Sequence, residues 1–436
     1  MINVYELQNM TKSVRDRIMK RSQNDIDQVK TKVEEIIAAV KSDGDAALVH
    51  FAKKWDDPEF SLAKLKITDT DIKEAYKNTP KEIIDKIKEQ ISLAQKFHKI
   101  QKERILNWEQ ELEEGIIVGE KWTPIANVGL YIPGGKNPFP TVQQILAVAA
   151  KTAGCPRIIS CISAKGKNYE VLIAANECGI KEIYRVSGAQ AIAAMAYGTE
   201  TIAPVDLIAG PGNTYVTAAK ILCQSKIAID APAGPSEVLI LADNSASPEC
   251  DLNKKAKYCA ADLLAQAEHG TDSVVVLLTD SKQLAQLTKD ELEKQFEKLS
   301  RKEDIQKSLA TYSAIIITHS MNEAIAFAND YAPEHLEILT KNPEEILKQI
   351  NHAGSVFLGL NNPVALGDYA TGINFCLPTG GWTRQSSPVG VWTFMKRVQY
   401  SFVTKPGLAR LCPIVQTIAT VEGLDAHRHS VEIRLE

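Results

Sequence analysis

The sequence lacks several features that would place it in a special class of protein. Its 436 residues contain no apolar stretch long enough to span a bilayer, because Lys, Asp or Gly interrupts every long hydrophobic run. The eight cysteines form no CxxC pair and no cluster, which indicates buried, reduced thiols and not a disulfide framework. The first residues have neither the charged nor the apolar region of a secretory signal. We therefore expect a cytoplasmic protein that does not enter a membrane.

An excess of one charge is also missing. The chain has 50 Lys and Arg against 54 Asp and Glu, a net charge of -4, and no basic tract. This balance argues against nucleic acid or an anionic membrane surface as a partner. With 44% hydrophobic and 24% charged residues, the composition is that of a globular protein. A chain of this length is expected to form about two to four domains.

Alternating strands and helices are predicted from about residue 128 onwards. One run of apolar strands and helices extends from 128 to 242, and a second from 259 to 358. Helices of this length between strands indicate βαβ units and mainly parallel sheets. No GxGxxG occurs anywhere, which excludes the standard dinucleotide fingerprint. The predicted fold class is α/β, with two Rossmann-like parallel-sheet domains that lack this fingerprint, plus small N-terminal and C-terminal helical elements.

The expected domain boundaries follow these changes in pattern. Residues 1–25 form a small N-terminal element. Residues 26–125, which are helical and rich in Lys and Glu, join residues 240–390 in a first, discontinuous α/β domain. Residues 126–239 form the second α/β domain, and residues 391–436 form a less regular C-terminal element.

Two pairs of side chains suit metal binding and proton transfer. Gln266 and His269 are three residues apart on a predicted helix and would project from the same face. Glu334 and His335 follow Pro333, and a turn there would bring both side chains to one site. An imidazole is a candidate base near neutral pH, and a carboxylate can activate water. Taken alone, the first pair is more typical of a polar helix end and the second of a surface dipeptide.

Two further segments add possible ligands. Asp368 lies in a glycine-flanked loop, where an ordinary turn is the alternative explanation. His427 and His429 are two apart in the C-terminal tail, so in an extended chain both would face the same way. The turn at 209–213 follows an apolar strand and opens a helix, which offers backbone N–H groups to an anion. These patterns predict a metal-dependent α/β enzyme and leave its reaction open.

Seven motifs, taken in order, resemble those of the histidinol dehydrogenase family. They are Gly-Leu-Tyr-Ile-Pro-Gly-Gly (129–135), Gly-Ala-Gln-Ala-Ile-Ala-Ala (188–194), Ala-Gly-Pro-Gly-Asn (209–213), Pro-Ala-Gly-Pro-Ser-Glu-Val (232–238), Asp-Leu-Leu-Ala-Gln-Ala-Glu-His-Gly (262–270), Ala-Pro-Glu-His-Leu (332–336) and Leu-Gly-Asp-Tyr-Ala (366–370). The resemblance runs from about residue 120 to the end, and more loosely through the preceding helices. It implies a homodimer that uses Zn2+ and NAD to oxidise L-histidinol to L-histidine through L-histidinal, the last step of histidine biosynthesis.

The resemblance also implies a role for each matching position. The zinc ligands would be Gln266, His269, Asp368 and His427, with His427 carried by the C-terminal element into the active site of the partner subunit. His335 would take the alcohol proton, and Glu334 would help water to attack the aldehyde. Tyr131, Gln190 and Asn213 match positions that contact NAD. The substrate would contact Ser236, Glu422, His335 and the four zinc ligands.

The chain departs from the family pattern at one position near the site. Where the family has Gly-Thr-Asn-His, this chain has Gly372-Ile373-Asn374-Phe375, and a phenyl ring can neither exchange a proton nor carry charge. Residues 250–257 also look like an insertion. The alternative is a paralogous zinc- and NAD-dependent alcohol dehydrogenase that acts on another small polyol, such as a sulfonated propanediol. A zinc hydrolase using Glu334 or His335, and a non-catalytic relative, are the other hypotheses.

Overall fold

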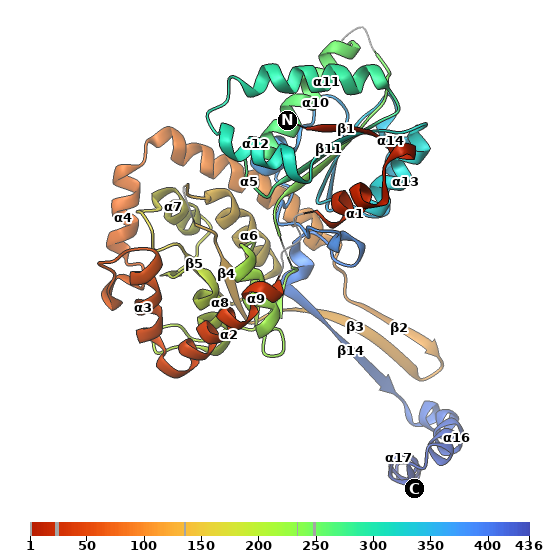
Figure 1. Ribbon diagram of the computed structural model, residues 1–436. Coiled ribbons are helices and arrows are strands. Elements are labelled where there is room, and N and C mark those ends of the chain that lie inside the picture. The colour runs from red at the N-terminus through yellow and green to blue at the C-terminus, as the bar shows by residue number, and fades with distance from the viewer. Residues whose placement is uncertain (1, 22–25, 135–136, 233, 247–249) are drawn as a thin grey trace.

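The computed structural model describes residues 2–21, 26–134, 137–232, 234–246 and 250–436. Gly135 of the first predicted motif, Ala233 of the fourth, and part of the predicted 1–25 element lie outside the described residues. The described chain forms two parallel sheets flanked by helices, and a long arm that projects from them (Figure 1).

The first parallel sheet has five strands in the order β6-β5-β4-β7-β8. Its strands are β4 (Asn127–Tyr131), β5 (Arg157–Ile162), β6 (Glu182–Arg185), β7 (Leu207–Ala209) and β8 (Ala228–Ile229). They are connected by α6 (Pro140–Ala153), α7 (Tyr169–Glu177), α8 (Gly188–Tyr197) and α9 (Thr214–Cys223). The first strand in sequence is central, and the chain winds outward to both sides of it. This is the order of a doubly wound nucleotide-binding sheet.

The second parallel sheet repeats this order and adds one strand at its edge. Its six strands are arranged β1-β11-β10-β9-β12-β13. They are β1 (Asn3–Glu6), β9 (Glu237–Ala242), β10 (Val274–Thr279), β11 (Ala314–Ile317), β12 (His335–Leu339) and β13 (Ser355–Leu358). Its helices are α10 (Leu252–Ala267), α11 (Lys282–Phe296), α12 (Lys302–Thr311), α13 (Met321–Tyr331), α14 (Pro343–Leu347) and α15 (Val364–Tyr369). The predicted α/β class with two parallel sheets is confirmed.

The N-terminal helices pack around the five-stranded sheet, and not with residues 240–390 as the predicted grouping of residues 26–125 requires. Helices α2 (Ile26–Asp43), α3 (Asp45–Trp55), α4 (Asp69–Asn78) and α5 (Lys81–Glu103) bury their apolar faces in the clusters around the five-stranded sheet. Helix α2, for example, packs on α8 and α9. The helical periodicity identified the buried face, but periodicity carries no information about which sheet covers it.

Residues 3–20 belong to the domain of the six-stranded sheet. Strand β1 pairs in parallel with β11, and α1 (Lys12–Lys20) follows it along the same domain. Short 3-10 helices occupy Leu7–Asn9, Leu62–Lys64, Trp382–Arg384 and Val391–Phe394. The N-terminal segment is therefore an edge of a larger domain, and its α1 end reaches the middle of the molecule.

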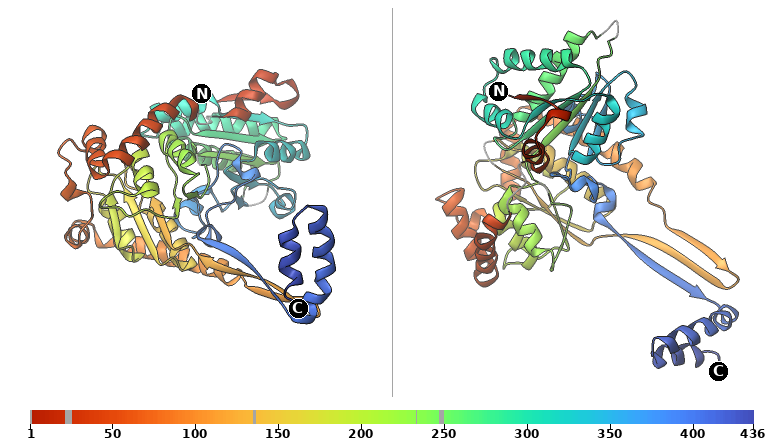
Figure 2. Two further views of the ribbon diagram at one scale, coloured as in Figure 1. Left: turned by 90° about the horizontal axis from the view of Figure 1, so that it is seen from below. Right: turned by 45° about the vertical axis from the view of Figure 1, so that its right-hand side comes forward.

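The arm combines segments from distant parts of the sequence. Strands β2 (Trp108–Glu113), β3 (Ile116–Pro124) and β14 (Met395–Val403) form an antiparallel sheet, which leads to α16 (Lys405–Val421) and α17 (Asp425–Glu432). The arm extends away from both domains in every view (Figures 1 and 2). The tail is thus regular, and residues 108–124 share a sheet with it. His427 and His429 lie in a helix and do not face the same way, contrary to the extended-chain expectation.

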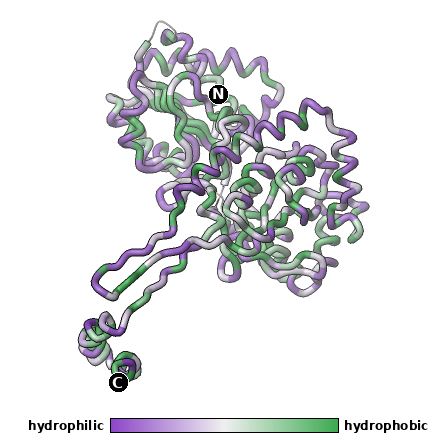
Figure 3. Tube along the Cα trace, turned by 180° about the vertical axis from the view of Figure 1, so that it is seen from behind, coloured by the Kyte–Doolittle hydropathy of each residue, from purple (hydrophilic) through white to green (hydrophobic). Residues whose placement is uncertain are grey.

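The two domains are joined where their sheets end. The chain leaves the first sheet at the carboxyl end of β8 and enters the second at the amino end of β9. The central strands of both sheets are apolar and buried in the interior of the molecule (Figure 3). All eight cysteines are buried, and none of them forms a disulfide among the described residues. Among the described helices none is both long and apolar enough to cross a membrane.

Candidate functional site

Glu334 and His335 lie where α13 turns into β12. Ala332 ends the helix in the left-handed region (φ 52°), and Pro333 separates it from Glu334. His335 then opens β12, where it is in register with Val238 of β9. The predicted turn at Pro333 is present, whereas the strand that begins at His335 was not predicted. The pair sits at the amino-terminal edge of the six-stranded sheet, between the two strands where its order reverses.

This turn brings the two side chains together in the protein interior. The His335 Nδ1 atom is 3.4 Å from the Glu334 Oε2 atom and 3.0 Å from the Glu237 carbonyl oxygen. The Glu334 Oε2 atom accepts a hydrogen bond of 2.8 Å from the Glu237 backbone N–H. Glu334 and His335 are each 5% exposed. The second imidazole nitrogen, Nε2, is buried and has no hydrogen-bond partner among the described residues.

Asp368 faces this unpartnered nitrogen. Its Oδ1 atom lies 4.0 Å from His335 Nε2. Burial raises the pKa of Asp368, while the nearby His335 and His269 rings act to lower it. Burial alone would lower the pKa of His335, but the charges of Glu334 and Asp368 outweigh it and raise that pKa to about 9. The site therefore favours a positive charge between its carboxylates.

Helix α10 brings the other predicted ligands to the same edge of the sheet. Gln266 is 3% exposed, and its Nε2 atom is buried without a partner among the described residues. His269 lies in the exposed turn after the helix, with its backbone N–H donating to the Gln266 carbonyl at 3.3 Å. The described part of the chain contains no group of three His, Cys, Asp or Glu side chains that could hold a metal.

A pair of acids lies behind these side chains, the buried Glu337 and the partly buried Asp262. Glu337 is two residues beyond His335 on β12, and Asp262 is one helical turn before Gln266 on α10. The Glu337 Oε1 atom accepts a 2.7 Å hydrogen bond from the Val364 N–H at the start of α15, the helix that carries Asp368. Burial raises the pKa of Asp262 to about 6, and burial together with the Asp262 charge raises the pKa of Glu337 well above its ordinary range.

These raised pKa values predict a pH-dependent cost to stability. A group whose pKa is higher in the folded than in the unfolded state stabilises the folded protein at low pH, and this stabilisation is lost as the pH rises through the two pKa values. For Asp262 the loss falls between about pH 4 and pH 6. Glu337→Gln keeps an acceptor for Val364 and removes one of the two acids. We expect its melting temperature to exceed that of the unaltered protein at pH 8 by about 2–4 °C, and the difference to shrink toward pH 4. Scanning calorimetry across this range measures it, with the exposed, surface-paired Glu345→Gln as the control. A constant difference at every pH would contradict the prediction.

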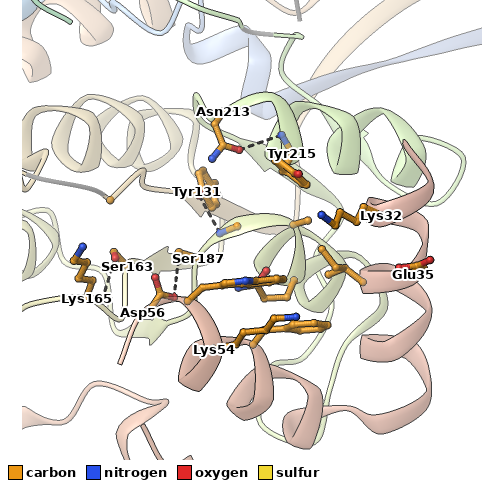
Figure 4. A pocket seen from close by; sticks show the side chains of 17 residues that line it. Lys32, Glu35, Lys54, Asp56, Tyr131, Ser163, Lys165, Ser187, Asn213 and Tyr215 are labelled. Atoms are coloured by element: carbon orange, nitrogen blue, oxygen red, sulfur yellow. Dashed lines mark hydrogen bonds between the residues drawn. The ribbon is translucent and has the colours of Figure 1, made fainter. Parts of the chain in front are cut away.

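The predicted NAD-contacting residues line a separate pocket of about 680 Å³ in the five-stranded domain (Figure 4). Tyr131 ends β4, and its hydroxyl accepts a 3.1 Å hydrogen bond from the Gly188 N–H at the start of α8. Asn213 follows β7 and caps α9 by accepting from the Tyr215 and Val216 N–H groups. Gln190 is 2% exposed, with its Oε1 atom buried and unpartnered among the described residues.

This pocket lies where a doubly wound sheet usually binds its ligand. Residues that follow four neighbouring strands line it, at the carboxyl edge where the strand order reverses. On its outer side, Trp55 of α3 stacks on Phe51 at a centroid distance of 4.9 Å. The pocket therefore offers a polar floor, the start of a helix and an aromatic wall, which together suit a dinucleotide.

The remaining predicted residues are divided between the body and the arm. Ser236 immediately precedes β9, the strand that pairs with β12 at His335. Glu422 and His427 are exposed on the arm, far from the site of their own chain (Figure 1). The apparent insertion at 250–257 is the start of α10, which Asp251 caps. Phe375 is half-buried and shares with Asp368 the lining of a small space next to α5.

Three charged residues of the site, Glu237, Glu337 and Arg21, were not predicted from the sequence. Glu237 and Glu337 are acids within otherwise apolar strands, Glu-Val-Leu-Ile-Leu-Ala and His-Leu-Glu-Ile-Leu, and this is a recognisable signal. Arg21 left no such signal, since it follows an ordinary charged helix. Only the fold shows that it is buried against Glu237.

Comparison with known proteins agrees over the whole chain. The histidinol dehydrogenase family profile matches residues 19–435. Histidinol dehydrogenase of Methanocaldococcus jannaschii is 42% identical over 436 residues, 99% of each chain. That of Vibrio parahaemolyticus is 44% identical over 409 residues, 93% of this chain and 91% of the relative. The crystal structure of histidinol dehydrogenase from Elizabethkingia anophelis matches with a TM-score of 0.92 and 38% identity, covering 100% of this chain and 98% of that one. This chain therefore belongs to the histidinol dehydrogenase family and is a dehydrogenase.

Proposed function

We propose that the protein is a zinc- and NAD-dependent enzyme that oxidises L-histidinol to L-histidine through L-histidinal, the last step of histidine biosynthesis. The observation that carries the proposal is the buried Glu334–His335 pair, with an unpartnered imidazole nitrogen facing Asp368. Family membership supports L-histidinol as the substrate. The two relatives named above are histidinol dehydrogenases, and this chain covers 99% and 91% of their lengths.

The residues present fit a zinc ion. Gln266, His269 and Asp368 offer oxygen and nitrogen donors at one edge of the sheet, and buried polar atoms of Gln266 and His335 lack protein partners among the described residues. Zinc accepts such donors and usually takes four. We propose His427 of a second subunit as the fourth. The ion, when bound, would serve mainly as a template that holds the amine and imidazole of the substrate.

His335 is proposed to accept the proton of the substrate alcohol. Its Nδ1–H can donate to the Glu237 carbonyl, so Nε2 is the basic atom of the neutral ring, the form that grows as pH rises toward the His335 pKa of about 9. As Nε2 takes the hydroxyl proton, the carbinol C–H leaves as a hydride and the aldehyde forms. The burial of the pair excludes bulk water from this step.

Glu334 is proposed to act in the second oxidation. Its carboxylate is held by the Glu237 N–H and can take a proton from the water that attacks the aldehyde. The resulting hydrate loses a second hydride and a proton to give the carboxylate. Asp368 and Ser236 in the body, and Glu422 on the arm, are proposed to orient the substrate.

NAD is proposed to bind in the pocket lined by Tyr131, Gln190 and Asn213, and it would accept the hydride in each oxidation. The buried Gln190 amide and the start of α9 supply hydrogen-bonding groups, and the aromatic wall of Phe51 and Trp55 supplies a stacking surface. The pocket opens at the carboxyl edge of its sheet, and the connection 230–236 runs from there to the edge that carries His335.

A homodimer with shared active sites is part of the proposal. The arm exposes apolar side chains that a stable protein normally covers, namely Leu112, Phe402, Ile414, Ile418 and Val421, each more than half exposed. The residues Ile414, Ile418 and Val421 follow helical spacing along α16 and form one stripe. A second copy that covers this stripe would bring α17 of one chain toward the body of the other.

Disrupting this apolar stripe of α16 should therefore dissociate the proposed dimer into monomers. We expect Ile418→Glu to shift sedimentation toward the monomer, because a carboxylate would replace a methyl-rich contact. Thr420→Glu introduces the same charge on another side of α16 and should leave the dimer unchanged. A dimer that persists in Ile418→Glu would contradict the proposed role of the arm.

Formation of NADH from L-histidinol by zinc-loaded enzyme tests the function. A zinc hydrolase would turn over its substrate without NAD, and a non-catalytic relative would fail to bind zinc. A paralogous dehydrogenase would reduce NAD with another small polyol and not with histidinol. Phe375 favours this last alternative, because it places a phenyl ring beside Asp368. Cytoplasmic location stays a prediction.

A further inference from the structure

Arg21 is buried beside the candidate active site although it lies at the end of an exposed helix. It follows α1 in the left-handed region of backbone conformation (φ 58°), which is unfavourable for a residue with a Cβ atom. Its side chain is 3% exposed, and its guanidinium lies 3.6 Å from the centre of the Tyr331 ring. A strained backbone and a buried charge are both costly, so this placement needs compensating contacts.

Glu237 provides the main contact. The Arg21 NH1 group donates to the Glu237 Oε1 atom at 3.0 Å, and the Glu237 side chain is 2% exposed. The same oxygen accepts from the Glu334 N–H at 3.1 Å and from the Gly380 N–H at 3.2 Å. Thus one carboxylate oxygen joins α1, the turn that carries Glu334, and the loop after residue 379.

The backbone of Glu237 holds the two candidate catalytic side chains. Its N–H donates to Glu334 Oε2, and its carbonyl lies 3.0 Å from His335 Nδ1. The side chain of Glu237 therefore fixes the backbone of Glu334, while its main chain fixes the side chains of Glu334 and His335. A movement of Glu237 would displace the proton-transfer pair as a unit.

The ionisation of the Glu237 carboxyl depends on Arg21. Burial raises the pKa of Glu237 to about 7, the Arg21 charge opposes that rise, and the Glu334 charge adds to it. The titratable groups that face Glu237 are Arg21, Glu334, His335 and Tyr331. Burial raises the pKa of Tyr331, so its hydroxyl stays neutral. Arg21 is the nearby cation that favours the ionised form of Glu237.

We propose that Arg21 is a positioning residue, which acts through Glu237 to hold Glu334 and His335 in the geometry that proton transfer requires. The inference rests on the proposed function, because it assigns a role toward that reaction. It goes beyond that function by making the N-terminal segment a working part of the active site.

The test compares Arg21→Met, Glu237→Gln and the double variant, each as full-length, zinc-loaded enzyme. We expect Arg21→Met to lower kcat for histidinol oxidation at pH 7 by about ten- to hundredfold, with the KM for NAD unchanged. Relative to the unaltered enzyme at the same pH, its activity should recover as pH rises from 7 to 9, because Glu237 then loses its proton and the charged carboxylate accepts more strongly from the Glu334 N–H. The double variant has no carboxyl at this position and should show the loss without the recovery.

Two controls separate positioning from a structural effect. Arg17→Met removes an exposed arginine of α1 that contacts Tyr5, and it should leave the kcat and the pH profile unchanged. Arg21→Lys, which keeps the charge, should restore the unaltered pH profile and most of the kcat. Melting temperature and zinc content are measured for every variant.

An Arg21→Met enzyme with the kcat and pH profile of the unaltered enzyme would overturn the inference. If methionine prevents folding, Glu237→Gln decides: a kcat loss of about tenfold or more is expected, and full activity would overturn it. Failure of the proposed function is distinguishable, since the unaltered enzyme would then produce no NADH from histidinol.

Discussion

Replacing His335 with glutamine is expected to lower the kcat for L-histidinol oxidation by about 10²–10⁴-fold, the usual contribution of a general base. The introduced amide could still donate to the Glu237 carbonyl, which His335 approaches through Nδ1. It could not accept the alcohol proton that the unpartnered Nε2 atom is placed to take. The KM for NAD should change little, because the proposed NAD pocket lies in the other domain. Steady-state kinetics at saturating zinc measures both constants.

His319→Gln is the matched control for this variant. His319 is an exposed histidine whose ring contacts Gln8, away from the site, and its replacement should leave kcat unchanged. Zinc content must be equal in both variants, since a loss of metal would also lower kcat. A His335→Gln enzyme that keeps more than about a tenth of the kcat would remove His335 from the role of base.

Mixed dimers of two inactive chains are expected to regain activity. The proposed site takes His335 from one subunit and His427 from the other. A dimer of one His335→Ala chain and one His427→Ala chain then has one site with both histidines and one site with neither. Purified mixed dimers should show about half the activity of the unaltered enzyme, and random mixing should give about a quarter. Dual-tag purification followed by an NADH assay measures the recovery.

The control pairs two chains altered in the body of the protein, His335→Ala and Asp368→Ala. The body of one subunit supplies both residues to a given site. Each of the two sites in that mixed dimer therefore lacks one of them, and no recovery is expected. Absence of recovery in verified His335→Ala and His427→Ala dimers would mean that the arm does not complete the neighbouring site.

The sequence predicted the two parallel sheets well because their signal is local. Apolar strands such as β4 and β10 alternate with helices of suitable length, and Gly154 ends α6 in the left-handed conformation that glycine adopts readily. Strand β12 was missed because Glu337 interrupts its apolar run. A buried acid weakens the strand pattern, although here it marks the site.

The packing of the N-terminal helices and the arm could not be predicted in the same way. Helix α2 has a clear apolar face, but that face fits either sheet equally well in sequence terms. Strand β14 pairs with β3, more than 270 residues earlier in the chain, and no local pattern encodes this partner. The placement of Arg21 against Glu237 has the same origin, since the contact spans 216 positions.

The candidate site was predicted residue by residue from family resemblance, and its geometry came only with the fold. Glu334, His335 and Asp368 meet at the amino-terminal edge of a sheet. General rules for doubly wound sheets point to the opposite, carboxyl edge. Those rules do locate the pocket of Tyr131, Gln190 and Asn213. Proton transfer is therefore proposed at the amino-terminal edge of the six-stranded sheet, and cofactor binding at the carboxyl edge of the five-stranded sheet.

The number of NADH molecules formed per L-histidinol consumed tests the central claim most directly. Oxidation of an alcohol to a carboxylate removes four electrons, so zinc-loaded enzyme with excess NAD should form two NADH for each L-histidine, with no free aldehyde. Absorbance at the NADH band together with chromatography of the amino alcohol and amino acid gives the ratio. One NADH with accumulating aldehyde, or no NADH at all, would contradict the claim that one site carries out both oxidations.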